Sequence, residues 1–332
     1  MTAVTTDWPP LEALVGDIRD ILDGASRISC LAHKDADADS LGSALGFALS
    51  MRALGRDARV LVPSPMPRML DYLPGFDTIT EAGADDVGVL FTFDCATTAR
   101  FGDKQDLIRT APIVVNVDHH VSNEGFGAIN LIEPQASATG QVVYELLRAL
   151  GAPISADVAT NLYAALFTDT GGYRHENTTE AALRLGADLV AAGADPVWVA
   201  LKSYNSRSVA QLKLEGLAVA NLRTEFNGRL VWSAITLEML EQTGAEMMES
   251  EGVIDQLQSI DAVEVAVLFK ENEPGVTKVS VRTREPLDAT RICAPFGGGG
   301  HRRAAGAELN QPLATFAPRV LEVARELLRA SG

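Results

Sequence analysis

The stretch of sequence that most restricts the fold is an apolar run that ends abruptly in one carboxylate and two imidazoles. Residues 112–117 read Pro-Ile-Val-Val-Asn-Val, and Asp118, His119 and His120 follow directly. A short run rich in β-branched residues favours a buried strand. In an open α/β sheet, ligands bind beyond the carboxyl ends of the strands. The run therefore predicts a parallel sheet with a functional site at this strand end, although a solvated strand end with chance histidines stays open at this point.

Length and composition predict a two-domain globular protein. The chain has 332 residues, of which 47% are apolar, and typical domains have about 100–200 residues. No uncharged apolar run approaches the roughly 18–20 residues of a membrane-spanning helix. The first ten residues lack a basic region followed by an apolar core, so we expect no signal peptide. Cys30, Cys95 and Cys293 show no CxxC spacing, which favours a cytoplasmic location over a disulfide framework.

The charge of the chain excludes one class of substrate. The formal net charge is −16, whereas a protein that holds long nucleic acid carries a basic stripe. A long polyanion is therefore not the expected substrate. Clustered carboxylates can instead serve as metal ligands, and a few well-placed arginines can bind a short anionic substrate.

A second carboxylate-rich stretch follows a predicted strand at residues 27–32. His33, Asp37 and Asp39 come directly after it, with Asp35 between them, and a helix is predicted through residue 54. Carboxylate oxygens and imidazole nitrogens form a ligand set suited to Mn²⁺-type ions. Crowded carboxylates repel one another unless a cation offsets the repulsion. The alternative is helix N-capping, which accounts for one aspartate but not for the whole set.

Two further carboxylates stand at the ends of predicted elements. Asp94 follows a predicted strand at residues 86–93, and Asp169 follows a predicted helix at 156–167, just before two glycines. The negative end of the helix dipole disfavours a carboxylate there, and a metal ion would remove that objection. Two plainer interpretations stay open, namely that Asp94 begins a turn and that Asp169 is a solvated loop residue.

The remaining pattern predicts an α/β protein divided into domains at residues 1–203 and 209–332, joined by a short polar linker at 204–208. Further strands are expected at 57–63 and 128–132, and further helices at 137–150, 179–192 and 196–203. In the second domain the pattern predicts helices at 209–222, 247–260 and 313–330. It also predicts a hairpin turning at Asn227-Gly228 and another joining strands 263–270 and 276–284.

The second domain carries a candidate anion site. Gly297, Gly298, Gly299 and Gly300 precede His301, Arg302 and Arg303. Glycines leave backbone N–H groups unshielded and allow left-handed geometry, and such N–H groups can form an anion nest. Strand alternation places Arg282 and Arg284 on one face of the strand at 276–284. The alternative for the glycine run is a flexible linker.

Taken in order, these motifs resemble those of the DHH phosphoesterase superfamily. The resemblance rests on His33-x-x-x-Asp37-x-Asp39, Asp94, Asp118-His119-His120 and Asp169, and Gly297–His301 with Ala304-Ala305-Gly306 resembles the glycine-rich motif of the DHHA1 domain. The layout is similar to the bacterial nanoRNase and pAp-phosphatase group. Ala36 stands where the family usually has proline, an exchange that loosens the turn but keeps the spacing of the ligands.

The resemblance implies a parallel-sheet DHH domain with flanking helices, a smaller mixed-sheet α/β DHHA1 domain, and an active site in the cleft between them. It implies two Mn²⁺ ions, with Mg²⁺ or Co²⁺ as alternatives. One ion is expected on His33 and Asp37, the other on Asp39, His119 and Asp169, with Asp94 as the bridge. Asp118 is expected to orient its neighbours, and His120 to approach the scissile phosphate. The implied substrate contacts are Arg282, Gly298, Gly299, Gly300 and His301, with Asn123 and Arg100 as further candidates.

The resemblance also implies an activity. The enzyme is expected to cut short oligoribonucleotides and dinucleotides such as pApA, with cyclic di-AMP as a further substrate, and to dephosphorylate 3′-phosphoadenosine 5′-phosphate (pAp) to AMP. No membrane or long nucleic acid is expected as a partner, and a homodimer is allowed. A family II inorganic pyrophosphatase is an alternative, against which the glycine-rich motif argues. A non-catalytic nucleotide sensor is another alternative, but it would be expected to lack some of the ligands present here.

Overall fold

The computed structural model describes residues 8–80, 87–250 and 252–331. The chain forms two compact units, Met1–Ser206 and Arg207–Gly332. The first residue of the predicted third strand, Asp86, lies outside the described residues, as does Glu251 in the predicted helix 247–260.

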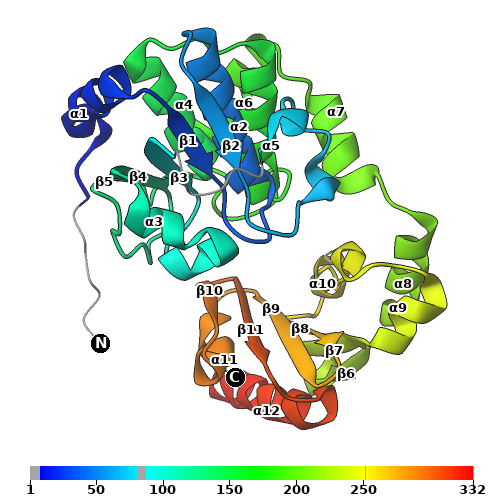
Figure 1. Ribbon diagram of the computed structural model, residues 1–332. Helices are drawn as coiled ribbons and strands as arrows, with labels where there is room; N and C mark the ends of the chain where they lie inside the picture. Colours follow the sequence, from blue (N-terminus) through cyan, green and yellow to red (C-terminus); the bar gives the residue numbers. More distant parts are fainter. Residues whose placement is uncertain (1–7, 81–86, 251, 332) are drawn as a thin grey trace. The chain divides into compact units, whose positions relative to one another are not determined.

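A parallel sheet forms the centre of the first unit (Figure 1). Its strand order is β2-β1-β3-β4-β5, and neighbouring strands pair in parallel throughout, which confirms the predicted fold class. The carboxyl ends of parallel strands lie at one edge of a sheet, so the residues that follow β1, β3 and β4 come together there. The strands are β1 (Ile28–Leu31), β2 (Ala58–Leu61), β3 (Val89–Phe93), β4 (Ile113–Asp118) and β5 (Ile129–Ile132).

Helices flank this sheet (Figure 1). They are α1 (Leu11–Gly24), α2 (Ala38–Ala53), α3 (Asp106–Thr110), α4 (Thr139–Leu150), α5 (Ala156–Asp169), α6 (Glu180–Ala191) and α7 (Pro196–Ala200). The predicted helix at 196–203 is shorter as an α-helix, because a π-helical turn, Leu201–Asn205, continues from α7. Short 3₁₀ turns lie at Arg68–Leu70, Phe76–Thr78 and Thr98–Lys104.

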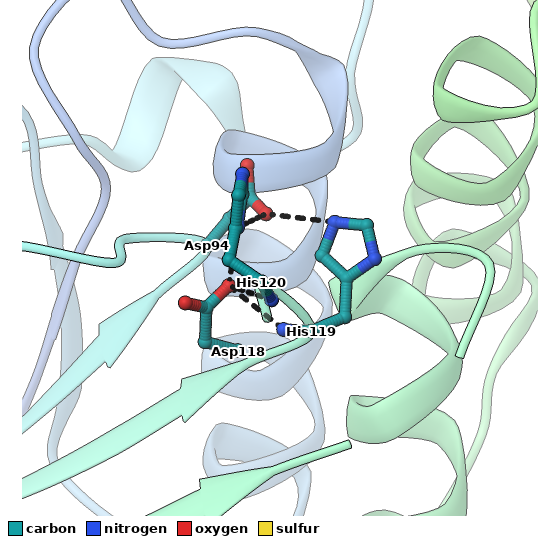
Figure 2. A group of neighbouring side chains, drawn as sticks. All are labelled: Asp94, Asp118, His119 and His120. Carbon is teal, nitrogen blue, oxygen red and sulfur yellow. Dashed lines mark hydrogen bonds and ion pairs between the residues drawn. The ribbon is translucent and has the colours of Figure 1, made fainter. Parts of the chain in front are cut away.

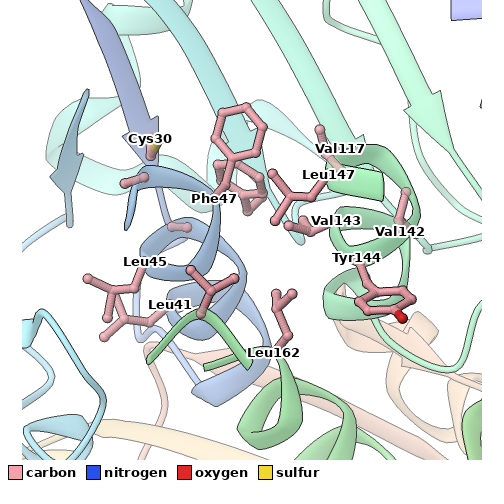
Figure 3. Packing of buried hydrophobic residues seen from close by; sticks show 14 of the residues in the cluster. Cys30, Leu41, Leu45, Phe47, Val117, Val142, Val143, Tyr144, Leu147 and Leu162 are labelled. Carbon is pink, nitrogen blue, oxygen red and sulfur yellow. The ribbon is translucent and has the colours of Figure 1, made fainter. Parts of the chain in front are cut away.

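The central helix α2 owes its position to small residues. Ala, Gly and Ser make up much of its sequence, and nearly all of its residues are buried between the sheet, α4 and α5 (Figure 3). A side chain at Gly42 would place its Cβ 2.6 Å from the carbonyl oxygen of Asn161 in α5, and one at Gly140 would meet Ala165 at 2.6 Å. These glycines let the helices approach closely, which carries the start of α2 to the strand ends.

The second unit contains a mixed sheet with the order β10-β11-β9-β8-β7-β6. Strands β7 and β8 are parallel, and the other pairs are antiparallel, as expected for the smaller domain. The strands are β6 (Arg223–Glu225), β7 (Leu230–Ile235), β8 (Val265–Glu273), β9 (Val276–Thr283), β10 (Gly299–His301) and β11 (Ala304–Leu309). The helices are α8 (Val209–Ala220), α9 (Leu237–Thr243), α10 (Val253–Gln258), α11 (Thr290–Cys293) and α12 (Leu313–Ser331).

Several local expectations for this unit differ from the structure. The predicted helix at 247–260 is divided into a 3₁₀ turn, Met247–Ser250, and α10. The turn at Asn227-Gly228 is part of a 3₁₀ segment, Phe226–Gly228, with φ +56° at Asn227. Helix α9 was not expected, and the second half of the glycine run, Gly299 and Gly300, lies in strand β10 rather than in a flexible linker. Among the described residues, no helix is both long and apolar enough to cross a membrane.

The packing of α2 yields a test with a matched control. Replacing Gly42 by Ala forces a Cβ against the backbone of Asn161, and such overpacking costs about 1–3 kcal/mol. Gly16 lies in α1, where an added Cβ would meet open space, so Gly16→Ala should stabilise by up to about 1 kcal/mol. Thermal unfolding without added metal should show a lower Tm for Gly42→Ala and an unchanged or higher Tm for Gly16→Ala. Equal Tm values would contradict the close packing.

Candidate metal centre

Three strand ends and two helix termini bring the polar residues together. His33 follows β1 by two residues, Asp94 follows β3 directly, and Asp118 ends β4. Asp37 caps α2 by accepting a hydrogen bond from the Ser40 amide at 2.9 Å, so the capping interpretation is correct for this aspartate. Asp94 has φ +60°, a backbone geometry that non-glycine residues adopt at functional sites more often than elsewhere.

One group of possible ligands contains His33, Asp37 and Asp94. The Nε2 atom of His33 lies 3.8 Å from Asp37 Oδ2 and 3.5 Å from Asp94 Oδ2. The imidazole of His33 is buried, whereas the Asp37 side chain is 59% exposed. This group therefore opens to solvent on the side of Asp37.

A second group contains Asp39, His119 and Asp169. The Nε2 atom of His119 lies 3.8 Å from Asp39 Oδ2, 3.7 Å from Asp169 Oδ2 and 3.5 Å from Asp94 Oδ1. Asp94 thus faces His33 with one oxygen and His119 with the other. Figure 2 shows His119 and His120 at the end of β4, beside Asp94. The geometry places Asp94 between the two groups.

The residues fit divalent ions by three criteria. His33 Nδ1 lies 2.8 Å from the Lys34 carbonyl and His119 Nδ1 lies 3.1 Å from the Ala136 carbonyl, an arrangement that turns Nε2 towards the carboxylates. Ligands about 2.1 Å from one ion and about 90–110° apart lie about 3.0–3.4 Å from one another. The observed separations of 3.5–3.8 Å are close to this and too long for good hydrogen bonds. The donor set, imidazole nitrogen with carboxylate oxygen, suits Mn²⁺-type ions.

Asp39 is held by a feature that the sequence did not reveal. Its carboxylate accepts hydrogen bonds from the amides of Thr139 at 2.8 Å and Gly140 at 2.9 Å, at the start of α4. The positive end of the helix dipole favours a carboxylate at this position. The Thr139 hydroxyl also donates to Asp94 Oδ1 at 2.8 Å. The N-terminus of α4 therefore orients two of the predicted ligands, and only the Thr-Gly pair at a predicted helix start could have hinted at it.

The Asp118 carboxylate accepts hydrogen bonds from the two residues that follow it. Its Oδ1 atom accepts hydrogen bonds from the His119 amide at 2.7 Å, the His120 amide at 3.2 Å and His120 Nδ1 at 2.7 Å. Asp118 is fully buried, and His120 is partly buried beside it. A carboxylate can only accept here, so Nδ1 of His120 carries a proton and Nε2 is directed away from Asp118.

Charges within the cluster shift its pKa values in a consistent pattern. Burial by itself would lower the pKa of His33, but the contacts with Asp37 and Asp94 outweigh this effect and raise the pKa to about 10. Burial would likewise lower the pKa of His119, but the charges of Asp94 and Asp169 raise it to about 9. Burial raises the pKa of Asp169 to about 7, and burial with the charge of Asp94 raises the pKa of Asp39. Without an ion, protons on these groups offset the repulsion between carboxylates.

Burial by itself would raise the pKa of Asp94, but the neighbouring histidines hold this pKa well below its ordinary value. The largest lowering effect is the contact with His33, followed by the charges of His120 and His119. The pKa of His120 is raised by its hydrogen bond to Asp118 and by the charge of Asp94, again against the effect of burial. Asp94 therefore stays ionised at the centre of the cluster.

Asp169, the last residue of α5, is supported from a distant loop. The Asn177 side chain donates to Asp169 Oδ2 at 3.3 Å and to the Asp169 carbonyl at 3.2 Å. The same amide group donates to the Ser137 carbonyl at 2.9 Å. This contact was not foreseen, since nothing in the local sequence pairs Asn177 with either residue.

Two candidate substrate contacts of the first unit, Arg100 and Asn123, have different surroundings. Arg100 places a guanidinium nitrogen 3.0 Å from each ring nitrogen of His33, so it lies at the first ligand group. Asn123 is buried, and protein groups bind both ends of its amide. The phosphate contact suggested for Asn123 gains no support from this placement.

The candidate substrate residues of the second unit lie on β9 and β10. The Arg282 side chain is 28% exposed, and its Nε atom lies 3.7 Å from Asp255 Oδ1. Gly299 to His301 form the edge strand β10, which pairs with β11 and is exposed. A side chain at Gly298 would clash with the Gly306 carbonyl, so glycine is needed there for packing as well as for any ligand. The location of these residues relative to the metal centre stays a prediction.

Comparison with known proteins identifies both units. The model of the DHH family N-terminal domain matches residues 27–166, and the DHHA1 domain model matches residues 227–330. The bifunctional oligoribonuclease and PAP phosphatase NrnA of Thermus thermophilus is 32% identical over 96% of this chain and 95% of its own length. The protein of the same name from Bacillus subtilis is 24% identical over 83% of this chain and 87% of its own.

A solved structure has the same fold. The exopolyphosphatase-related protein from Bacteroides fragilis superimposes with a TM-score of 0.86 and 23% identity, over 98% of each chain. At that identity the likeness concerns the fold alone.

The pKa pattern predicts that metal binding releases protons. His33 and His119 have raised pKa values of about 10 and 9, so both are protonated at pH 7 without an ion. A metal ion needs the unprotonated nitrogens and displaces these protons. Calorimetric titration with Mn²⁺ at pH 7, in buffers of different ionisation enthalpy, should report net proton release. The release should decrease as the pH approaches 9, and a heat that does not depend on the buffer would contradict the assignment.

Proposed function

The chain belongs to the DHH family and carries a DHHA1 domain. We propose that it is a two-metal phosphoesterase that acts on short oligonucleotides and on nucleotides such as pAp. Members of this family are hydrolytic enzymes, and so is this one. The proposed reactions are cleavage of short oligoribonucleotides and dinucleotides to mononucleotides, and removal of the 3′ phosphate from pAp. Cyclic di-AMP is a further proposed substrate, and Mn²⁺ is the proposed metal.

The observation that carries the proposal is the position of Asp94 between two ligand groups. One group offers His33 and Asp37, and the other offers Asp39, His119 and Asp169, with one Asp94 oxygen facing each. Paired divalent ions supply a nucleophilic hydroxide and neutralise charge on the phosphoryl group. The side chains of both groups come from the start of α2, the end of α5 and the segments after β1, β3 and β4. The first residues of α4 support them, because the Thr139 and Gly140 amides hold Asp39.

His120 is proposed to act on the leaving oxygen. Its Nδ1 proton is held by Asp118 at 2.7 Å, which fixes the ring and directs Nε2 away from that carboxylate. A histidine held in this way can donate a proton from Nε2 or stabilise the charge that develops on the phosphate. Since the donor is fixed before substrate binds, the orientation costs little during the reaction.

Substrate choice is proposed to rest on few positive groups. The chain is strongly acidic, so its surface repels a long polyanion but tolerates a short one bound by selected arginines. Arg282, the β10 segment Gly299–His301 and Arg100 are the proposed contacts for the phosphates and the nucleoside. The names of the Thermus and Bacillus relatives, oligoribonuclease and PAP phosphatase, support this substrate class.

The activity is tested with a panel of substrates under one set of conditions. The protein with Mn²⁺ should release phosphate from pAp and mononucleotides from pApA, and Asp94→Ala should lower both rates by at least about 10³-fold because both ligand groups lose a member. Cyclic di-AMP, a five-nucleotide RNA and pyrophosphate complete the panel. Turnover of pyrophosphate alone would favour the pyrophosphatase alternative. Nucleotide binding without turnover would favour a sensor.

Arg282→Ala tests the substrate contact separately from chemistry. Loss of a charged hydrogen bond to a phosphate should raise KM for pAp about 10-fold and leave kcat nearly unchanged. Arg184→Ala is the control, because that arginine is exposed and pairs locally with Glu180 on α6. An unchanged KM in Arg282→Ala would remove the residue from the proposed site.

A further inference from the structure

Two polar side chains are buried in an otherwise apolar core on the α3 side of the first sheet. Thr92 on β3 and Asn116 on β4 are fully buried and stand directly opposite each other in the strand register. Their neighbours on the same faces of the strands, Leu90 and Val114, belong to an apolar cluster that includes Leu107 of α3. A buried amide is costly unless its hydrogen bonds are made, so the position of Asn116 calls for a reason.

Hydrogen bonds connect this pair to the functional site. The Thr92 hydroxyl donates to Asn116 Oδ1 at 3.0 Å, and Asn116 Nδ2 donates to Asn123 Oδ1 at 3.1 Å. Asn123 Nδ2 in turn donates to Asp118 Oδ2 at 2.6 Å. The series begins in the core of the sheet and ends on the carboxylate that holds His120.

Backbone groups fix the direction of this series. The Gly125 amide donates to Asn123 Oδ1 at 2.8 Å, and Asn123 Nδ2 donates to the Cys95 carbonyl at 3.2 Å. An amide N–H can only donate and a carbonyl can only accept, so the Asn123 side chain has one orientation. Asn116 must then present its NH₂ group to Asn123 and its oxygen to the Thr92 hydroxyl. The series therefore delivers a donor to Asp118 and offers no alternative arrangement.

The result is a carboxylate whose two oxygens are both occupied by protein donors. Asp118 Oδ1 accepts from two backbone amides and from His120 Nδ1, and Oδ2 accepts from Asn123. Although Asp118 lies near Asp94 and both histidines, these bonds direct it towards the loop rather than towards an ion.

We propose that Asn123, supported by Asn116 and Thr92, is a positioning residue that fixes Asp118 and, through it, the ring of His120. This replaces the phosphate contact that the sequence suggested for Asn123. The inference rests on the proposed function in one respect, namely that His120 acts on the leaving oxygen. It requires no direct contact between Asn123 and either substrate or metal.

Kinetics of matched variants form the first test. Asn123→Ala should lower kcat for pAp about 10–100-fold, with KM and bound Mn²⁺ unchanged, as for other residues that orient an active-site group. Asn130→Ala is the control, because Asn130 stands opposite Asn116 in the strand register but its side chain bonds to the amide and carbonyl of Gly127, at 2.9 and 2.8 Å, rather than joining the series. It should leave kcat within about 2-fold of the wild-type value.

A second pair of variants acts from the far end of the series. Thr92→Val keeps the shape of the side chain but removes the donor, so kcat should fall by a smaller factor than in Asn123→Ala. Thr92→Ser keeps the hydroxyl and should restore the wild-type rate. A raised KM with unchanged kcat in Asn123→Ala would overturn the proposal by making Asn123 a substrate contact, and loss of Mn²⁺ would overturn it by making Asp118 a ligand.

A spectroscopic readout separates this inference from the proposed function. In protein labelled with ¹⁵N-histidine, the Nδ1–H group of His120 should give a signal that shifts or disappears in Asn123→Ala and Thr92→Val but persists in Asn130→Ala and Thr92→Ser. If the wild-type protein cleaves neither pAp nor pApA, the proposed function fails while this measurement still tests the positioning role. An unchanged signal together with an unchanged kcat in Asn123→Ala would overturn it.

Discussion

The structure of the first unit depends on the cost of gathering carboxylates in a buried space. Asp39, Asp94 and Asp118 are almost fully buried within a few ångströms of three histidines, in a chain that is strongly acidic overall. Charges of like sign at such separations destabilise one another by several kcal/mol unless they are offset. Each carboxylate is offset differently: Asp39 by backbone amides, Asp118 by its own loop and Asn123, and Asp94 by the histidines. Asp94 depends on charged histidines rather than on backbone donors, so a cation in either ligand group would take over this role when the histidines give up their protons.

The packing of the helices follows from the same requirement. Backbone amides of α4 reach Asp39 at the start of α2, and both helices pack closely against α5 through small residues. A Cβ added at Gly140 would lie 2.6 Å from that of Ala165, and one added at Gly42 would be equally close to the backbone of α5. The glycine and alanine content of α2 therefore serves electrostatics as well as packing.

Much of the candidate site could be predicted from sequence because strand ends have a strong local signature. An apolar run followed by a carboxylate or histidine marks His33, Asp94 and Asp118 without knowledge of the fold. The supporting residues carry no such signature. Thr92 and Asn116 are 24 positions apart, and Ser137 and Asn177 are 40 apart, so their pairing depends on strand register and on a loop. In the sequence, Asn116 is only a polar residue within an apolar strand. Its link to Asn123 follows from the hydrogen bonds of the folded structure.

The one departure from the family pattern shows how such support replaces a local constraint. Where the DHH motif usually has proline, this chain has Ala36, and the preceding Asp35 takes φ +56°. Proline restricts the backbone of its own position and of the residue before it, so alanine leaves the turn freer in isolation. In the folded protein the turn is held from outside: the Lys34 amide donates to the Arg100 carbonyl at 2.7 Å, and the His33 amide donates to Ser40 Oγ at 3.0 Å. Ser40 Oγ then donates to the Phe93 carbonyl at 3.1 Å, which ties the turn to the strand that carries Asp94. Hydrogen bonds to two neighbouring segments therefore supply the rigidity that the missing ring would have given, and the spacing of the ligands is kept.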